Sequence, residues 1–207
     1  MNLSLKELLD RLDHWLNEHG GYEANHEFRV LVEAMRRGEI ALGSQVRATK
    51  YLFEARDPRG NLKWAEECWN LVVTVGLNDA LDKHFKGSSY TAAWYVGITT
   101  GSDTFAAADT MSSHAGWTEC TAYDEATRPA LTLGAVSGGS VDNSASKARF
   151  TISTNSTVIG GAFVTTNNTK GGSTGTLYGG AAFAAGDKTL DDNDTLDVTV
   201  TLTATAS

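Results

Sequence analysis

The chain has 207 residues, with 17 Lys and Arg against 25 Asp and Glu and a net charge of −8 at pH 7. Residues 87–207 hold 5 basic and 11 acidic residues, a balance that repels a phosphate backbone and argues against a nucleic-acid partner. The sequence has neither a basic and then apolar leader nor a run of 18 apolar residues, so we expect neither a secretion signal nor a membrane partner.

Residues 1–45 are predicted to form a short N-terminal helical arm. Ser4 followed three residues later by Glu7 has the pattern of a helix-capping box, and Gly20-Gly21 would end the first helix. Its apolar residues recur at helical spacing, at Leu5, Leu8, Leu9, Leu12, Trp15 and Leu16. A second helix is predicted from the similar spacing of Ala24, Phe28, Leu31, Val32 and Met35. The glycine turn between them indicates a helical hairpin.

The arm supplies the candidate partner-binding residues of the sequence. These residues are large and apolar and should form one surface: Leu8, Leu12, Trp15, Phe28 and Leu31. Two short helices make a thin core, so another element must cover this surface. We expect the arm to reach a neighbouring subunit; the alternative is an ordinary helical layer packed on its own domain.

The β-region is predicted to begin near residue 46 with a hairpin. Residues 50–56 have the composition of a strand, and Asp57-Pro58-Arg59-Gly60 has the residue preferences of a type I turn. Residues 61–64 would return the chain. Residues 71–75 are a further predicted strand, followed by a short amphipathic helix over 77–85. The apolar residues of that helix recur every four positions, at Leu77, Leu81 and Phe85.

The rest of the chain predicts many short strands separated by polar, glycine-containing turns. The predicted strands cover residues 92–98, 130–136, 148–152, 158–164, 176–179, 181–183 and 195–203. The last one alternates strictly, which predicts that four of its side chains point inward: Leu196, Val198, Val200 and Leu202. Because no helix of crossover length lies between the strands, the pattern favours a mainly β fold, an antiparallel β-sandwich over residues 46–207.

The residues that could carry chemistry do not form a recognised catalytic or metal-binding motif. Cys68 and Cys120 are far apart in the sequence and are expected to be buried free thiols, with a disulfide or a metal role as the alternatives. The acidic run Asp191–Asp194 lacks the spacing of a calcium loop and is expected to be a turn. The histidines of the arm, His14, His19 and His26, are expected to be solvated. Four tryptophans could form a platform that stacks on carbohydrate: Trp64, Trp69, Trp94 and Trp117. Trp64 and Trp94 lie on predicted strands, where core packing is expected. We therefore expect no catalytic site, no cofactor site and no metal site.

Several ordered motifs of residues 50–207 resemble a domain of tailed-bacteriophage virion proteins. They are Asn61-Leu62-Lys63-Trp64, residues 70–78, Ala92-Ala93-Trp94-Tyr95-Val96-Gly97, Ala115-Gly116-Trp117-Thr118-Glu119 with Tyr123, Ala126-Thr127-Arg128-Pro129, residues 141–148 and residues 161–168. The resemblance implies a jelly-roll-like capsid decoration, or cement, protein. It implies a fold and a place in the virion, not a reaction, and it does not extend to the arm.

The resemblance implies a non-enzymatic structural protein that binds and stabilises the major capsid shell. The implied partners are the major capsid protein and further copies of the chain in a homo-oligomer, and the implied location is the virion, after synthesis in the host cytoplasm. The alternative is a structural component of the tail, a fibre or a receptor-binding domain. A tail-associated hydrolase is the enzymatic alternative, and the sequence lacks the paired carboxylates in a motif that it would need.

Overall fold

The computed structural model describes residues 46–86, 93–101 and 103–205 of the chain. The predicted arm, with Leu8, Leu12, Trp15, Phe28 and Leu31, lies outside the described residues. The division into an arm over 1–45 and a β-domain over 46–207 therefore stays a prediction.

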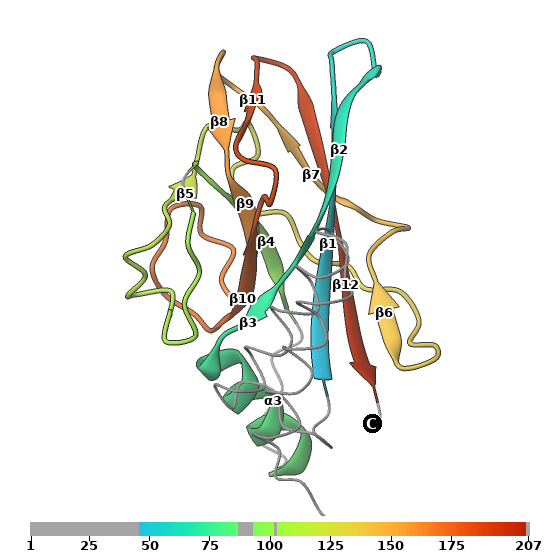
Figure 1. Ribbon diagram of the computed structural model, residues 1–207, viewed down its shortest axis with the longest axis vertical. Coiled ribbons are helices and arrows are strands. Elements are labelled where there is room, and N and C mark those ends of the chain that lie inside the picture. Colours follow the sequence, from blue (N-terminus) through green and yellow to red (C-terminus); the bar gives the residue numbers. More distant parts are fainter. Residues whose placement is uncertain (1–45, 87–92, 102, 206–207) are drawn as a thin grey trace, which may run out of the picture. The chain divides into compact units, whose positions relative to one another are not determined.

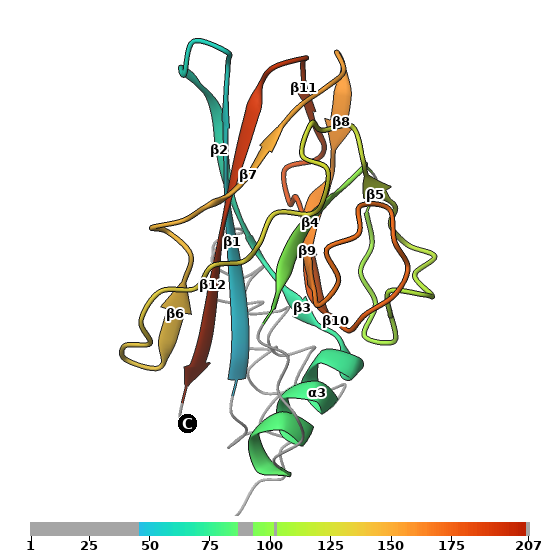
Figure 2. The ribbon, with the colours of Figure 1, turned by 180° about the vertical axis from the view of Figure 1, so that it is seen from behind.

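The described residues are mainly β-strand, with one helix among them (Figures 1 and 2). The strands of the first half and the helix are β1 (Val46–Arg56), β2 (Leu62–Trp69), β3 (Leu71–Val72), α3 (Thr74–Phe85), β4 (Tyr95–Thr99) and β5 (Glu119–Cys120). Those of the second half are β6 (Ser140–Asp142), β7 (Ala148–Thr151), β8 (Thr157–Ile159), β9 (Gly161–Thr165), β10 (Leu177–Ala182), β11 (Lys188–Leu190) and β12 (Thr195–Thr205).

Two five-stranded sheets carry most of these strands. The first has the order β2-β1-β12-β6, with β7 also paired to β12, and the second has the order β3-β10-β9-β4-β5. A small sheet pairs β11 with β8. The strand pairs of known register are antiparallel. This confirms the prediction of a mainly β fold with antiparallel sheets.

The apolar core takes side chains from both five-stranded sheets. Phe53 of β1 and Val198 of β12 belong to the same buried cluster as Ile98 of β4 and Val164 of β9. The ring of Phe53 meets that of Phe183, just after β10, edge to face with the ring centroids 4.6 Å apart. Burial of these residues removes apolar surface from water, the main driving force for folding.

The prediction for the last strand is confirmed. Leu196, Val198 and Val200 of β12 are fully buried, and Leu202 is half-buried and packs against the same core. The strand lies inside its sheet between β1 and the strands β6 and β7. On the opposite face of β12, the side chains of Asp197 and Thr199 are also buried.

The predicted hairpin is confirmed as well. The carboxylate of Asp57 accepts hydrogen bonds from the backbone N–H groups of Arg59 and Asn61, which closes the turn between β1 and β2. Gly60 has φ +85°, a left-handed conformation that glycine adopts without strain. In both views this hairpin lies at the opposite end of the sheets from α3 (Figures 1 and 2).

Four predictions for strands differ from the structure. Residues 176–179 and 181–183, predicted as separate strands, form the single strand β10. Residues 130–136 do not form a strand; Ala130 makes an isolated bridge to Tyr95, since the backbone beyond it lacks a continuous partner strand. Residues 158–164 are broken at Gly160 into β8 and β9, which belong to different sheets. The strand predicted over 71–75 is only the two-residue β3, because α3 already begins at Thr74.

Candidate protein-binding site at helix α3

Helix α3 turns its small residues toward the sheet and its leucines away from it. Gly76 lies so close to β10 that a Cβ atom there would be 2.5 Å from the backbone oxygen of Tyr178. Ala80, four residues later, lies on the same side of the helix. Leu77 and Leu81 are each one position further along, about 100° around the helix, and are 39% and 51% exposed. The predicted helix is confirmed, although it begins earlier than predicted, at Thr74. The two leucines of its predicted apolar face are exposed to solvent.

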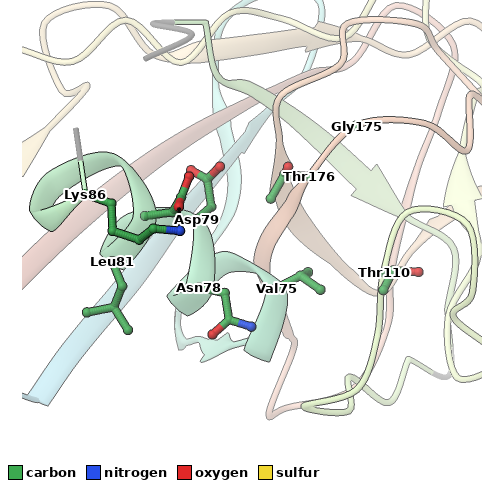
Figure 3. A pocket seen from close by; sticks show the side chains of 9 residues that line it. Val75, Asn78, Asp79, Leu81, Lys86, Thr110, Gly175 and Thr176 are labelled. Carbon is green, nitrogen blue, oxygen red and sulfur yellow. Dashed lines mark ion pairs between the residues drawn. The ribbon is translucent and has the colours of Figure 1, made fainter. Parts of the chain in front are cut away.

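A groove of about 860 Å³ runs along one side of α3 (Figure 3). Its far wall is formed by Thr110 and by Gly175-Thr176, which precede β10. Residues of the helix form the near wall: Val75, Asn78, Asp79, Leu81, Asp82 and Lys86. The ammonium group of Lys86 lies 2.9 Å from the carboxylate of Asp82, one helical turn before it. The groove thus combines an apolar part, at Val75 and Leu81, with charged groups of both signs.

A second, smaller pocket of about 380 Å³ lies between α3 and the strands that it covers. Its lining is mainly apolar and includes Trp94, Leu131, Leu133, Val164, Tyr178 and Leu202. The rings of Trp94 and Tyr178 meet edge to face at 5.7 Å between centroids. Asp79 lines this pocket and the larger groove. The two hollows therefore flank the same helix.

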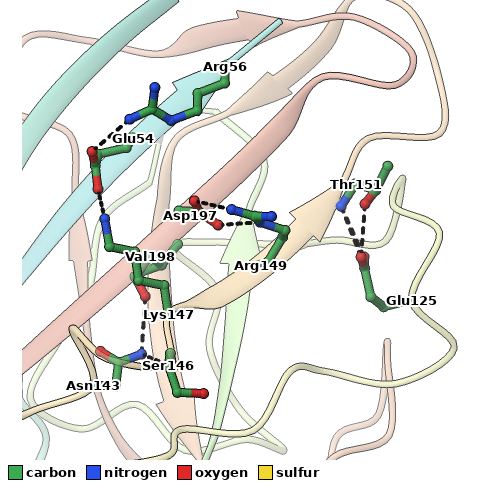
Figure 4. Close-up of polar contacts among 10 residues, drawn as sticks. All are labelled: Glu54, Arg56, Glu125, Asn143, Ser146, Lys147, Arg149, Thr151, Asp197 and Val198. Carbon is green, nitrogen blue, oxygen red and sulfur yellow. Dashed lines mark hydrogen bonds and ion pairs between the residues drawn. The ribbon is translucent and has the colours of Figure 1, made fainter. Parts of the chain in front are cut away.

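The outer side of the first sheet is polar, and its charges pair with one another (Figure 4). Glu54 of β1 contacts Lys147 and Arg56, and the hydrogen bond from Lys147 is the main cause that lowers the pKa of Glu54. Arg149 of β7 donates two hydrogen bonds of 2.7 Å to the carboxylate of Asp197 on β12. These bonds raise the pKa of Arg149. Each of these carboxylates already has a cation as its partner within the chain, which is typical of a structural role.

Arg128 is the largest fully buried side chain among the described residues. Its guanidinium donates to both carboxylate oxygens of Glu119, at 2.8 and 2.6 Å, and to the backbone oxygens of Asn167 and Gly172. It also lies over the ring of Phe163, 5.2 Å from the centroid. The planar group thereby joins its own loop to strand β5 and to the loop between β9 and β10. The role of Arg128 is structural, because its four hydrogen bonds all go to groups of the protein itself.

Asp103 is the acidic group with the most perturbed pKa among the described carboxylates. Burial is the main cause that raises its pKa to about 6, the charge of Asp187 adds to it, and a hydrogen bond from Thr99 opposes it. Its Oδ1 atom is buried and has no hydrogen-bond partner.

Both cysteines are buried free thiols, as predicted. Burial raises the pKa of Cys68 to about 11 and also raises that of Cys120, so neither thiol forms a nucleophilic thiolate readily at neutral pH. The described residues contain no group of three or more His, Cys, Asp or Glu side chains that could hold a metal ion.

The acidic turn and two of the tryptophans that the sequence offered as candidates have structural roles. Residues 191–194 form a turn, as predicted, in which Asp194 is buried and paired with Lys63. Trp64 and Trp94 pack against the core, which confirms the expectation for these two rings. Trp69, at the end of β2, is 69% exposed. His14, His19 and His26 lie outside the described residues.

Sequence reasoning missed the outward orientation of α3. The helical period shows that Leu77 and Leu81 share a face, but it does not show which face is buried. The signal that could have revealed it is Gly76 with Ala80, a pair of small residues at the same four-residue spacing, which allows a helix to approach a strand closely.

Comparison with protein-family models and with curated proteins finds no match to this chain. Within the part of the chain that the structure describes, none of the helical segments is both long and apolar enough to cross a membrane.

Proposed function

We propose that the protein is a non-enzymatic structural protein of a tailed-bacteriophage particle. In this proposal it decorates the capsid: it binds the major capsid protein, associates with further copies of itself and strengthens the assembled shell. It is made in the host cytoplasm and resides in the virion, and it acts without a cofactor.

The proposal includes a finer description of the fold, an antiparallel β-sandwich of the jelly-roll type. The shared core is its main support, since Phe53 and Val198 of one five-stranded sheet are buried in one cluster with Ile98 and Val164 of the other. Two inner faces that share one core are typical of sandwiches.

The resemblance to phage virion proteins rests on residues that build the fold. Trp64 and Trp94 pack against the core, Trp117 is buried, and Arg128 joins its own loop to β5 and to the loop between β9 and β10. Residues of this kind specify an architecture rather than a reaction. The motifs therefore support a shared fold and a structural role in the particle.

The observation that carries the proposal is the apolar surface left exposed around α3. Leu77 and Leu81 face solvent, and the segment just before the helix exposes Leu71 and Trp69. Exposed apolar and aromatic side chains that cluster along one segment are typical of protein-binding surfaces. The outer side of the first sheet, by contrast, carries charged side chains that are paired with one another rather than exposed apolar ones.

A protein that binds only the assembled shell stabilises that shell by mass action. Particles of a phage whose gene for this protein has been deleted should therefore release packaged DNA at a lower temperature than complete particles. Their adsorption to host cells should be unchanged. DNA release is measured by dye fluorescence during heating, and adsorption by counting unbound phage. A stable head with failed adsorption would instead assign the protein to the tail, a fibre or a receptor-binding structure.

A further inference from the structure

The small two-stranded sheet of β8 and β11 meets the second sheet at the end of β4. Gly160 directly follows β8, and Asp187 directly precedes β11. The N–H group of Gly160 donates to the backbone oxygen of Thr99, the last residue of β4, at 2.9 Å. The small sheet lies at the end of the sheets opposite α3 (Figures 1 and 2).

Two glycines leave space for two carboxylates at this point. A Cβ atom on Gly160 would overlap the carboxylate of Asp103, and it would lie 2.7 Å from the backbone oxygen of Thr100 and 2.9 Å from the Cα atom of Gly101. A Cβ atom on Gly101 would overlap the carboxylate of Asp187. The carboxylates of Asp103 and Asp187 are therefore both held where the small sheet meets the turn after β4.

The surroundings of Asp103 favour its neutral form. Oδ2 accepts a hydrogen bond from the hydroxyl group of Thr99, whereas Oδ1 is buried without a hydrogen-bond partner among the described residues. Burial of a carboxylate with an unpartnered oxygen is costly, and a proton removes much of that cost. Burial accordingly raises the pKa of Asp103 to about 6, and the negative charge of Asp187, which faces it, adds to the shift. The ammonium group of Lys188, beside Asp187 in the chain, is paired with Glu66 of β2 at 3.0 Å.

We infer that Asp103 is a pH-sensitive latch that holds the small sheet of β8 and β11 on the end of β4. While its carboxyl group is protonated, the small sheet stays docked. Once the group is ionised, local opening of the small sheet gives the carboxylate access to water and separates it from Asp187. The latch therefore tightens as the pH falls and loosens as the pH rises. It is a property of this fold and does not depend on the proposed capsid role.

The size of the effect follows from the linkage between proton binding and opening. If opening returns Asp103 to its ordinary pKa of 3.8, the equilibrium constant for opening should be about tenfold larger at pH 8 than at pH 5. The amides that pair β8 with β11 exchange their hydrogens with solvent only when the small sheet opens. Hydrogen–deuterium exchange of the full-length protein, followed by mass spectrometry and corrected for the intrinsic pH dependence of exchange, measures this opening.

We expect the protection of residues 157–160 and 188–190 to fall about tenfold between pH 5 and pH 8. Protection at the turn between β1 and β2 is the internal control and should not change, because that turn can open without exposing Asp103. The inference is overturned if protection of the small sheet does not depend on pH. It is also overturned if β8 and β11 open only together with β12, since the proton would then act on the whole fold and not on a local latch.

Three variants of the full-length protein test the role of Asp103 directly, with circular dichroism to confirm that each is folded. Asp103→Asn keeps the shape of the side chain without its charge, so protection of the small sheet should be equal at pH 5 and pH 8. Thr99→Val removes a hydrogen bond that lowers the pKa of Asp103, so the midpoint of the pH dependence should move to higher pH. Asp142→Asn, on β6, is the control and should keep the tenfold change. A full pH dependence in Asp103→Asn, or an unchanged midpoint in Thr99→Val, would contradict the latch.

Discussion

Arg128 shows how much a single buried side chain contributes to this fold. It connects Glu119, at the start of β5, with the loop after β9 through the backbone oxygens of Asn167 and Gly172. None of its side chain is exposed, and Glu119 is only 9% exposed. The long loops of the second sheet therefore depend on a charge pair that is shielded from water.

Replacement of Arg128 by Met should destabilise the protein by about 3–5 kcal/mol, because it leaves the carboxylate of Glu119 buried without a partner. The double variant Arg128→Met with Glu119→Leu should recover part of that loss, since it removes the stranded charge. Lys50→Met is the control: Lys50 pairs with Glu67 at the surface, and its loss should change stability by at most about 1 kcal/mol. Urea denaturation measures all three. Equal effects of Arg128→Met and Lys50→Met would contradict this role.

Asp103 should make the protein less stable as the pH rises, because its pKa is raised in the folded chain. Its pKa in the folded chain is about 6, above the ordinary value of 3.8. The folded state therefore binds this proton more tightly than the unfolded state does. The contribution of Asp103 is fully favourable below the unfolded value, and it is lost as the pH rises through about 6.

Asp103→Asn should therefore stabilise the protein by roughly 1–2 kcal/mol at pH 8. The advantage should shrink as the pH is lowered from 7 to 5, where Asp103 of the unaltered protein becomes protonated. Asp142→Asn is the control with the opposite sign, because hydrogen bonds from Ser144 lower the pKa of Asp142. Urea denaturation at a series of pH values measures the difference. A pH-independent difference between Asp103→Asn and the unaltered protein would refute the prediction.

The orientation of helix α3 is fixed by its contact with β10. A Cβ atom at Gly76 would lie 2.5 Å from the oxygen and 2.8 Å from the Cα atom of Tyr178. Gly76→Ala should therefore push the helix away from the strand and destabilise the protein by about 1–3 kcal/mol. The higher helix propensity of alanine, worth up to about 1 kcal/mol, would offset only part of this.

The control for this position is Asn78→Ala, an exposed site on the same helix. There alanine should leave stability unchanged or raise it slightly, because only helix propensity changes. Thermal unfolding followed by circular dichroism compares the two variants. If Gly76→Ala also raised the unfolding temperature, the close contact between α3 and β10 would be wrong.

The elements predicted well from the sequence are those whose pattern has a local cause. The alternation from Leu196 to Val200 follows from the two-residue period of a strand with one face in the core. The hairpin follows from the turn residues Asp57 to Gly60, whose hydrogen bonds are local. The candidate core residues Trp64 and Trp94 were also identified correctly.

The elements predicted poorly depend on contacts with distant parts of the chain. Residues 130–136 have a strand-like composition, but only Ala130 finds a bridge partner, in Tyr95. Gly160 ends β8 because its N–H bonds to the oxygen of Thr99, where the chain passes from the small sheet to β9. The outward position of the α3 leucines, and with it the candidate site, depends on the approach to Tyr178, which no local pattern contains.

The predicted arm over residues 1–45 should be needed for incorporation into particles but not for folding of the β-region. Its candidate residues, Leu8, Leu12, Trp15, Phe28 and Leu31, are expected to be covered by a neighbouring subunit in the virion. A chain of residues 46–207 should then remain folded, as measured by circular dichroism and cooperative unfolding, but should no longer be incorporated normally into particles. Unfolding of the shortened chain would show that the arm belongs to the core, and normal incorporation would show that the arm is not needed for binding.

The proposed function makes this chain a structural protein of the capsid. The most direct test is the number of copies per purified particle, measured by quantitative mass spectrometry relative to the major capsid protein. A capsid decoration protein should be present in hundreds of copies, in a fixed ratio to the capsid subunits. A number of about 3 to 12, as the closed symmetry of a tail structure would give, would contradict the capsid location. If purified particles did not contain the protein, the virion role would be contradicted altogether.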